Sequence, residues 1–402
     1  MTKKRLLLLG GSRYAVPVIE AAHGLGAEVV TADYLPGNFA HAFSDGYRNV
    51  SIVDAEAVLA CARELKADGI MSFAADPGVV SAAYAAERLG LPFQGSLEAV
   101  RTLQDKERFR AFLLGNGFNC PEARTYASAD VALADAGSLP YPVIAKPADS
   151  AGSKGCSRVN GPEGLRAAVE SALSFSPSGR CVVERFLEKA YPSSDADGFT
   201  VGGSFECVSF TAQLFDEAAP NPYAPAAYAM PAVMPDAALV SLESDLQRLS
   251  DLLCLRSGVY NIEARVADDG EPYVMEVSPR GGGNRLSEML RLASGVDLVR
   301  ASVQAALGLP VEGVRRPEVD GVWYQEVLHS NVAGIFQGVE YAPGFREAHV
   351  ADEQIWVEPG ARVEAFSAAN FAFGSVMVRF ETQGELETFR ADKESFMKVR
   401  VD

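Results

Sequence analysis

Residues 259–284 read V-Y-N-I-E-A-R-V-A-D-D-G-E-P-Y-V-M-E-V-S-P-R-G-G-G-N, two alternating runs separated by an Asp-Gly pair. Such a pair is a strong hairpin signal, because a type I′ turn needs positive φ at both of its central residues. A turn centred on Asp269 and Gly270 places Glu263 directly across from Glu276. The stretch therefore predicts an antiparallel hairpin with two facing carboxylates.

The same register sorts the other side chains of the hairpin by polarity. Asn261 and Ser278 share the face of the two glutamates. The opposite face is apolar and suits a core, with Ile262, Ala264 and Val266 across from Val277, Met275 and Tyr273.

The paired carboxylates of Glu263 and Glu276 need an explanation. Across a sheet they lie about 5 Å apart and repel by roughly 3 kcal/mol at an effective dielectric of 20. Solvation on an exposed face, protonation of one group, or a bound cation would each relieve this. Mg²⁺ accepts two carboxylates when phosphate oxygens and water complete its shell. The run Pro279–Arg285, with an arginine before three glycines, favours a metal and phosphate site.

Composition limits the classes of protein to consider. The 402 residues suffice for roughly two to four domains. A net charge of −17 argues against nucleic acid or an anionic membrane as the main partner. The six cysteines show no C-x-x-C spacing, and no apolar run approaches the length of a membrane span. We therefore expect a cytoplasmic protein with no membrane partner.

The N-terminal region has the pattern of a parallel βαβ unit. A strand at 5–9 leads into Gly10-Gly11-Ser12 and a helix, and a second strand at 28–32 ends at Asp33. A nicotinamide dinucleotide site is an alternative, but Tyr14 and its successor stand where the last glycine of G-x-G-x-x-G belongs. Half of the fingerprint is a weak signal.

The α/β pattern continues with helices near 54–67 and 77–89 and strands at 69–73 and 91–94. Asp76 lies just past a strand end, the edge where such sheets bind ligands. It precedes a proline, so it either caps a helix or holds a substrate amine. A change of character places a domain boundary near residue 100.

Two later strands carry further candidate site residues. The strand at 141–147 ends near Lys146, and residues 150–155 (S-A-G-S-K-G) form a small loop whose N–H groups can wrap phosphate. The loop is not a Walker A motif, and a plain surface turn is the alternative. The strand at 181–188 carries Glu184 and suits either adenine or a buried structural position.

The rest of the chain supplies scaffold. We expect strands within 199–215, a mobile Ala- and Pro-rich loop at 216–235, and a helix at 236–255. Helices at 285–293 and 297–308 follow the hairpin. From about residue 311 the pattern is β-rich, with a helix near 384–391 and no catalytic motif.

Together, these motifs make residues 5–310 resemble the ATP-grasp superfamily, and within it the carboxylate–amine (amino-acid) ligases. The resemblance implies an α/β and α+β multidomain protein. A Rossmann-like pre-ATP-grasp domain would span 1–100, and an ATP-grasp domain 101–310 with a lid at about 118–188. The β-rich domain at 311–402 resembles the C-terminal domain of biotin carboxylases. Family members are often dimers.

The resemblance also implies roles for single residues. ATP would be held by two lysines, a glycine loop and a hinge, namely Lys106, Lys146, Ser150, Gly152, Ser153, Lys154, Gly155, Glu184, Arg185, Phe186 and Leu187. Glu263 and Glu276 would bind Mg²⁺, with Mn²⁺ as a substitute. Arg280 would steady an acyl phosphate and, with Lys106 and Lys146, make the catalytic set. Asp76, Gly281 and Gly282 would contact substrate.

Two positions depart from the family pattern. Ser278 stands where an asparagine usually serves as a further metal ligand, so we expect a weaker third ligand there. The ribose-binding acid has no clear match, and Asp197 is the assignment, with Asp195 as a competitor.

The expected activity is joining a carboxylate to an amine through an acyl phosphate, with release of ADP and phosphate. A carboxyphosphate enzyme that uses bicarbonate and a non-catalytic nucleotide-binding module are the alternatives. Specificity is expected from Asp76, the loop at 216–235 and residues 281–285.

Overall fold

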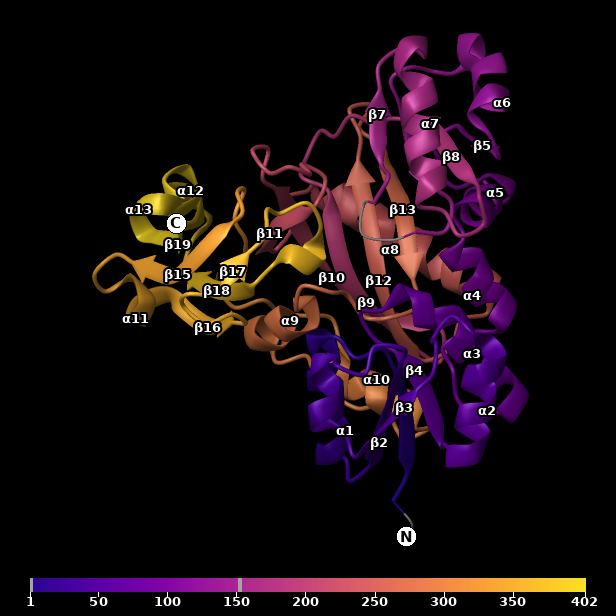
Figure 1. Cartoon of the computed structure of the whole chain (residues 1–402), viewed down its shortest axis with the longest axis vertical. Coiled ribbons are helices and arrows are strands. Elements are labelled where there is room, and N and C mark those ends of the chain that lie inside the picture. The colour runs from indigo at the N-terminus through magenta and orange to yellow at the C-terminus, as the bar shows by residue number, and fades with distance from the viewer. Residues whose placement is uncertain (1–2, 151–153) are drawn as a thin grey trace.

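The computed structural model describes residues 3–150 and 154–402, so Gly152 and Ser153 of the predicted phosphate loop lie outside the described residues. Figure 1 shows an upper lobe, an N-terminal lobe below it, and C-terminal strands to one side of a central sheet. The predicted multidomain α/β architecture is confirmed.

The N-terminal lobe is built on a parallel sheet in the order β3-β2-β1-β4. Its strands are β1 (Arg5–Leu9), β2 (Glu28–Asp33), β3 (Gly46–Asn49) and β4 (Gly69–Ser72). Its helices are α1 (Val16–Gly24), α2 (Ala55–Leu65) and α3 (Val79–Leu89). The leucines of β1 are buried on both faces of the sheet. A parallel strand that is covered on both faces needs apolar side chains throughout. No strand forms at the predicted 91–94.

The glycine turn after β1 has no room for a dinucleotide. The Gly11 N–H donates to Asp33 Oδ2 at 3.1 Å. A Cβ at Gly11 would lie 2.4 Å from His41 and 2.7 Å from Asn38, so this chain's own side chains cover the turn. The nicotinamide dinucleotide alternative is therefore not supported.

The upper lobe is a four-stranded antiparallel sheet in the order β5-β8-β6-β7 with two helices on it. Its elements are β5 (Ala123–Tyr126), α6 (Ala129–Ala134), β6 (Val143–Pro147), β7 (Ser157–Val159), α7 (Leu165–Ser174) and β8 (Cys181–Arg185). Two helices, α4 (Leu97–Gln104) and α5 (Lys106–Gly115), connect it to the N-terminal lobe. The apolar faces of α6 and α7 close a separate small core.

The central sheet has eight strands in the order β13-β12-β9-β10-β11-β14-β18-β16. They are β9 (Ser194–Val201), β10 (Ser204–Phe215), β11 (Pro225–Met230), β12 (Gly258–Val266), β13 (Pro272–Ser278), β14 (Val322–Leu328), β16 (Val350–Ile355) and β18 (Gly374–Phe380). The helices around the hairpin are α8 (Asp236–Leu253), α9 (Leu286–Ser294) and α10 (Leu298–Ala306). The predicted mobile loop at 216–235 is wrong in part, because β11 lies inside it and is buried.

The C-terminal segment adds strands to the central sheet and also forms a small sheet of its own. Because β11 pairs with β14, hydrogen bonding continues across the predicted boundary near residue 310. The small sheet comprises β15 (Gly334–Tyr341), β17 (Arg362–Val363) and β19 (Met397–Val401). The remaining helices are α11 (Phe345–His349), α12 (Gln383–Ala391) and α13 (Lys393–Phe396).

The β12–β13 hairpin confirms the predicted pairing at its polar end. Glu263 pairs with Glu276, and Asn261 pairs with Ser278. The predicted two-residue turn is wrong, because the loop spans 268–270 and only Gly270 in it has positive φ, at 81°. Its N–H donates to the Ala267 carbonyl at 2.9 Å, as in a three-residue hairpin loop.

A bulge corrects the one-residue shift that this longer loop introduces. The pairing is irregular between Glu263 and Ala264, and Ala264 faces Val274 in place of Met275. Val274 therefore points into the core behind the hairpin, whereas Tyr273 and Met275 join a small cluster on the other side. Their predicted place on the core face is wrong.

The helix behind the hairpin provides a test of this packing. Leu246 of α8 is fully buried in the same cluster as Ile262 and Val277. Leu246→Ala should destabilise the protein by about 3 kcal/mol, because a cavity forms in a close-packed core. Val240→Ala, on the same helix but 61% exposed, is the control and should change stability by less than about 0.5 kcal/mol. Thermal melting compares the two, and equal melting midpoints would contradict this packing.

Candidate active site

Three acidic side chains stand in a row across the central sheet, on the face away from α8. Asp195 of β9 pairs with Glu263 of β12, which pairs with Glu276 of β13. Desolvation by the surrounding protein raises the pKa of Glu263, and the charge of Glu276 raises it further. Burial, and then Glu263, raise the pKa of Asp195 to about 8. These groups form the acidic floor of the site.

The two predicted metal ligands fit a divalent cation. Within residues 3–150 and 154–402, the Glu263 carboxylate has no hydrogen bond or ion pair, although it faces Glu276 directly. The described chain holds no group of three or more His, Cys, Asp or Glu arranged around a metal. Two facing carboxylates without further protein ligands suit Mg²⁺ that also binds phosphate oxygens and water.

Lys106 lies beside this floor at the first turn of α5. Its Nζ is 3.5 Å from Glu276 Oε2 and donates to the Ser150 carbonyl at 3.0 Å. The helix begins there because the Asp105 carboxylate caps it, accepting from two N–H groups at 3.0 and 3.1 Å. Burial opposes the charge of Lys106, but Glu276 and its neighbours hold the pKa above its usual value.

Lys146 lies on β6 within a buried ionic group. Its Nζ donates to Glu184 Oε1 at 2.5 Å, and Arg110 of α5 donates to Glu184 Oε2 at 2.8 Å. Burial opposes ionisation of Glu184, but the two cations hold its pKa at about 2. Burial lowers the pKa of Lys146, against the attraction of Glu184. Lys146 and Lys106 thus approach the floor from two different elements.

The end of the phosphate loop is built around a glycine. Gly155 has φ 67°, and a Cβ there would lie 2.8 Å from the Phe175 ring. Lys154 is exposed, whereas Ser150 meets Lys106 through its carbonyl. Of the predicted loop residues that the structure describes, Ser150 contacts one of the two lysines.

The predicted adenine hinge, residues 184–187, begins inside β8 and continues past its end. The role predicted for its glutamate is wrong. The Glu184 carboxylate is only 1% exposed and is held by Arg110 and Lys146, so it is not free to bind adenine. Leu187 is buried beside Tyr273, with Met275 against them, and the three form a small apolar cluster. Phe186 lies below the Arg158 guanidinium at 4.5 Å, and Arg185 donates to the Tyr273 hydroxyl at 3.1 Å.

Arg280 and Asp76 hold each other at the opposite end of the floor. Arg280 Nε and Nη2 donate to the two Asp76 oxygens at 2.9 and 2.7 Å, and Nη1 donates to the Gly281 carbonyl at 3.1 Å. Burial opposes the charge of Asp76, but Arg280 keeps its pKa below the usual value. A guanidinium has five N–H donors, so one on each Nη remains for an oxyanion.

Ser278 supports this pair, and the structure does not show it as a free metal ligand. Its Oγ accepts from Gln104 Nε2 at 2.6 Å and donates to Asp76 Oδ1 at 2.6 Å. These two bonds leave one lone pair of the Ser278 hydroxyl unused, so its role as a third metal ligand stays a prediction.

The triple-glycine loop packs closely against its neighbours. A Cβ at Gly281 would lie 2.3 Å from the Phe73 ring, and one at Gly282 would lie 2.8 Å from Asp197 Oδ1. The Gly282 N–H donates to Asp197 at 2.7 Å, and Ser287 donates to its other oxygen. Asp197 therefore holds the glycine loop by hydrogen bonds next to Arg280. Its predicted contact with ribose, near the hinge, is not supported. Asp195, the competitor, accepts from Asn261 at 2.7 Å.

Two functional residues were missed from the sequence, Arg110 and Gln104. Arg110 lies four residues after Lys106, hence on the same face of a helix, and this spacing was the available signal. Gln104 carried no signal, because its partner Ser278 is distant in the sequence.

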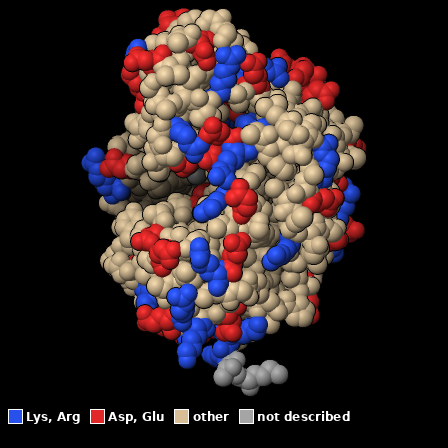
Figure 2. Space-filling view, turned by 90° about the vertical axis from the view of Figure 1, so that its right-hand side faces the viewer, with Lys and Arg blue, Asp and Glu red and all other residues tan. Residues whose placement is uncertain are grey.

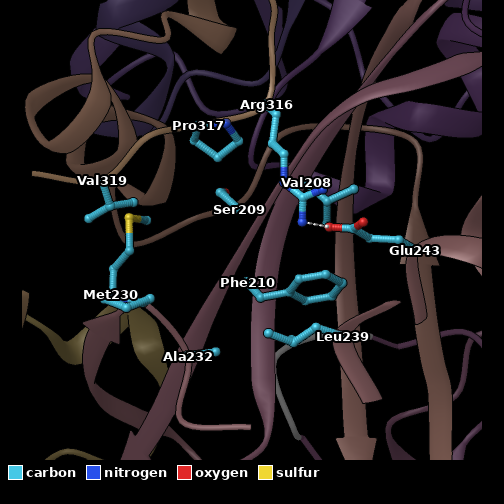
Figure 3. A pocket seen from close by; sticks show the side chains of 11 residues that line it. Val208, Ser209, Phe210, Met230, Ala232, Leu239, Glu243, Arg316, Pro317 and Val319 are labelled. Atoms are coloured by element: carbon cyan, nitrogen blue, oxygen red, sulfur yellow. Dashed lines mark hydrogen bonds and ion pairs between the residues drawn. The ribbon is translucent and has the colours of Figure 1, made fainter. Parts of the chain in front are cut away.

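Charged side chains gather at a hollow between the upper lobe and the body below it (Figure 2). A different hollow, of about 140 Å³, lies beside Phe210, Leu239 and Arg316 (Figure 3). Phe210 packs with α8 on the opposite face of the central sheet from Glu263. That pocket is therefore separate from the acidic floor.

Comparison with known proteins finds a family model that matches part of the chain. Residues 105–191 match the model of the carbamoyl-phosphate synthase L chain ATP-binding domain. The carbamoyl phosphate synthase large chain of Thermotoga petrophila is 26% identical over 254 residues, 63% of this chain and 23% of that protein. The chain thus spans about a quarter of the length of that relative.

Solved structures resemble the chain over nearly its whole length. An L-amino acid ligase from Bacillus licheniformis superposes with a TM-score of 0.81 at 20% identity, covering 100% of this chain and 99% of that one. A biotin carboxylase domain of the Hydrogenobacter thermophilus 2-oxoglutarate carboxylase, a dimer with MgADP and bicarbonate, gives 0.74 at 15% identity, covering 99% and 91%. The chain has the ATP-grasp fold, as its motifs predicted. In the described residues, no helix is long and apolar enough to cross a bilayer.

The buried Asp76–Arg280 pair provides a test of the site's architecture. Asp76→Ala should destabilise the protein by roughly 3–5 kcal/mol, because it leaves the Arg280 charge buried and unpaired. Asp130→Ala removes an ion-pair partner that is 84% exposed and should cost less than about 1 kcal/mol. Chemical denaturation measures both, and an equally small effect of the two variants would contradict the buried pair.

Proposed function

We propose that this protein is an ATP-dependent carboxylate–amine ligase that works through an acyl phosphate. The observation that carries the proposal is the unpartnered Glu263 facing Glu276, with Lys106 and Lys146 on one side and Arg280 beyond. This arrangement can bind a metal-bound triphosphate and, next to it, a second oxyanion.

Different residues would bind the adenine, the phosphates and the metal of MgATP. The half-buried Met275 beside Leu187 would give adenine an apolar contact, and the two lysines offer positive charge to the phosphates. Glu263 and Glu276 would hold Mg²⁺, which supplies charge neutralisation and alignment of the β- and γ-phosphates when bound. Mn²⁺ has the same oxygen preference and is an expected substitute.

Arg280 serves the acid substrate in this proposal. Asp76 fixes its guanidinium from one edge, so the two remaining Nη donors have a set direction. A substrate carboxylate placed there attacks the γ-phosphate and forms an acyl phosphate, and ADP leaves. An amine then attacks the acyl carbon, phosphate leaves, and the nitrogen loses a proton, which gives the amide.

Bicarbonate in place of an organic acid is the second candidate. The likeness to a biotin carboxylase domain with bound bicarbonate favours it, because bicarbonate would give carboxyphosphate by the same first step. The predicted three-domain division, a homodimer and a cytoplasmic location accompany the proposal as expectations. Light scattering tests the dimer.

The direct test is a phosphate-release screen of amino-acid pairs with ATP and Mg²⁺. Phosphate release that needs both an acid and an amine supports the ligase. Release with bicarbonate alone favours the carboxyphosphate reaction, and nucleotide binding without turnover in any mixture favours a non-catalytic module. Removing the metal with a chelator should stop the release, and adding Mg²⁺ or Mn²⁺ should restore it.

Glu276→Gln tests the metal site within this function. The neutral amide cannot balance a divalent cation, so phosphate release should fall by about a hundredfold or more while the fold is retained. Glu271→Gln changes an exposed glutamate at the far end of the same hairpin and should act as wild type. Full activity in Glu276→Gln would overturn the assignment of this residue.

A further inference from the structure

Arg110 is the most completely buried arginine near the candidate site, with a side chain only 3% exposed. Its Nε and Nη2 donate to the two oxygens of Glu184 at 2.8 and 3.4 Å. A third bond joins Nη1 to the Met275 carbonyl at 2.8 Å. One side chain of α5 thus binds both β8 of the upper lobe and β13 of the central sheet.

The charges of this buried group decide what Lys146 can do. Glu184 contacts two cations, Arg110 and Lys146, so the three side chains carry a net positive charge. Because Arg110 is a bidentate partner and cannot lose its proton in a protein, it neutralises Glu184 permanently. The Lys146 charge is therefore left for an anion.

Without Arg110, the remaining pair of Glu184 and Lys146 would lose the net positive charge. Glu184 and Lys146 alone would form a buried pair with no net charge, so a phosphate beside Lys146 would meet no net positive charge. The Met275 carbonyl next to Glu276 would also lose its donor. The loss of the net positive charge would weaken a phosphate site.

We propose that Arg110 is a positioning residue that neutralises Glu184, so that Lys146 can contribute its charge to nucleotide phosphate binding. This inference rests on the proposed function for the identity of the ligand. It assigns Arg110 no contact with the nucleotide, because its donors point to Glu184 and to β13.

A pair of variants separates this role from a packing role. Arg110→Met should weaken MgADP binding about tenfold or more, because Glu184 then competes for Lys146. The double variant Arg110→Met with Glu184→Gln removes both charges and should recover most of the lost affinity. Arg110→Lys keeps the charge and should stay closer to wild type than Arg110→Met. Arg108→Met, on the exposed side of α5, is the control.

Calorimetric titration of MgADP into the full chain measures the affinities, and thermal melting without nucleotide measures folding. Recovery in the double variant supports the proposal even if both variants melt earlier. Equal weakening in the single and double variants, or wild-type affinity in Arg110→Met, overturns it. If Arg110→Met does not fold, Arg110→Gln replaces it in the same comparison. A wild-type protein that binds no MgADP would instead overturn the proposed function.

Discussion

The repulsion between Glu263 and Glu276 is the constraint on which the rest of the site depends. Two adjacent strands fix these carboxylates opposite each other, and neither strand can move without disturbing the core behind it. The chain places cations around them from three separate elements: Lys106 from α5, Lys146 from β6 and Arg280 from the segment after β13. A bound cation with its anionic ligand would relieve the repulsion between the carboxylates and use the surrounding positive charges.

The division between lobes separates the Glu263–Glu276 pair from Lys146. The carboxylates belong to the central sheet, whereas Lys146 and Glu184 belong to the upper lobe. Arg110 lies on the helix that leads into that lobe and binds both sides. In the proposed function, the alignment of phosphate with the acidic floor would depend on how the two sheets are held together, and a buried ionic group holds them in a fixed direction.

The sequence was sufficient for the local patterns and insufficient for the partners of buried charges. Alternation with period two set the faces of β12 and β13, so the Glu263–Glu276 pair could be predicted. The turn was wrong because an Asp-Gly pair also fits a three-residue loop with one positive φ. Strand β11 was missed because P-A-A-Y-A-M has a weak strand propensity, and its neighbours in the sheet stabilise it.

The roles of two buried carboxylates were predicted wrongly for a different reason. Glu184 was assigned to adenine because it heads an apolar segment, but its partner Arg110 is 74 residues away in the sequence. Asp197 was assigned to ribose, whereas its partner Gly282 is 85 residues away. No periodicity links such residues, because the contact exists only once the lobes are folded together.

The serine at position 278 departs from the family pattern and joins two polar side chains of the candidate site. A short hydroxyl reaches both Gln104 and Asp76, and through Asp76 it helps to orient Arg280. An amide at this position would project further and would compete for the same donor and acceptor. In the proposed function, the two carboxylates would hold the metal, while Ser278 helps to orient the Arg280 guanidinium through Asp76. Metal affinity should consequently depend strongly on bound nucleotide, because phosphate oxygens must complete the coordination shell.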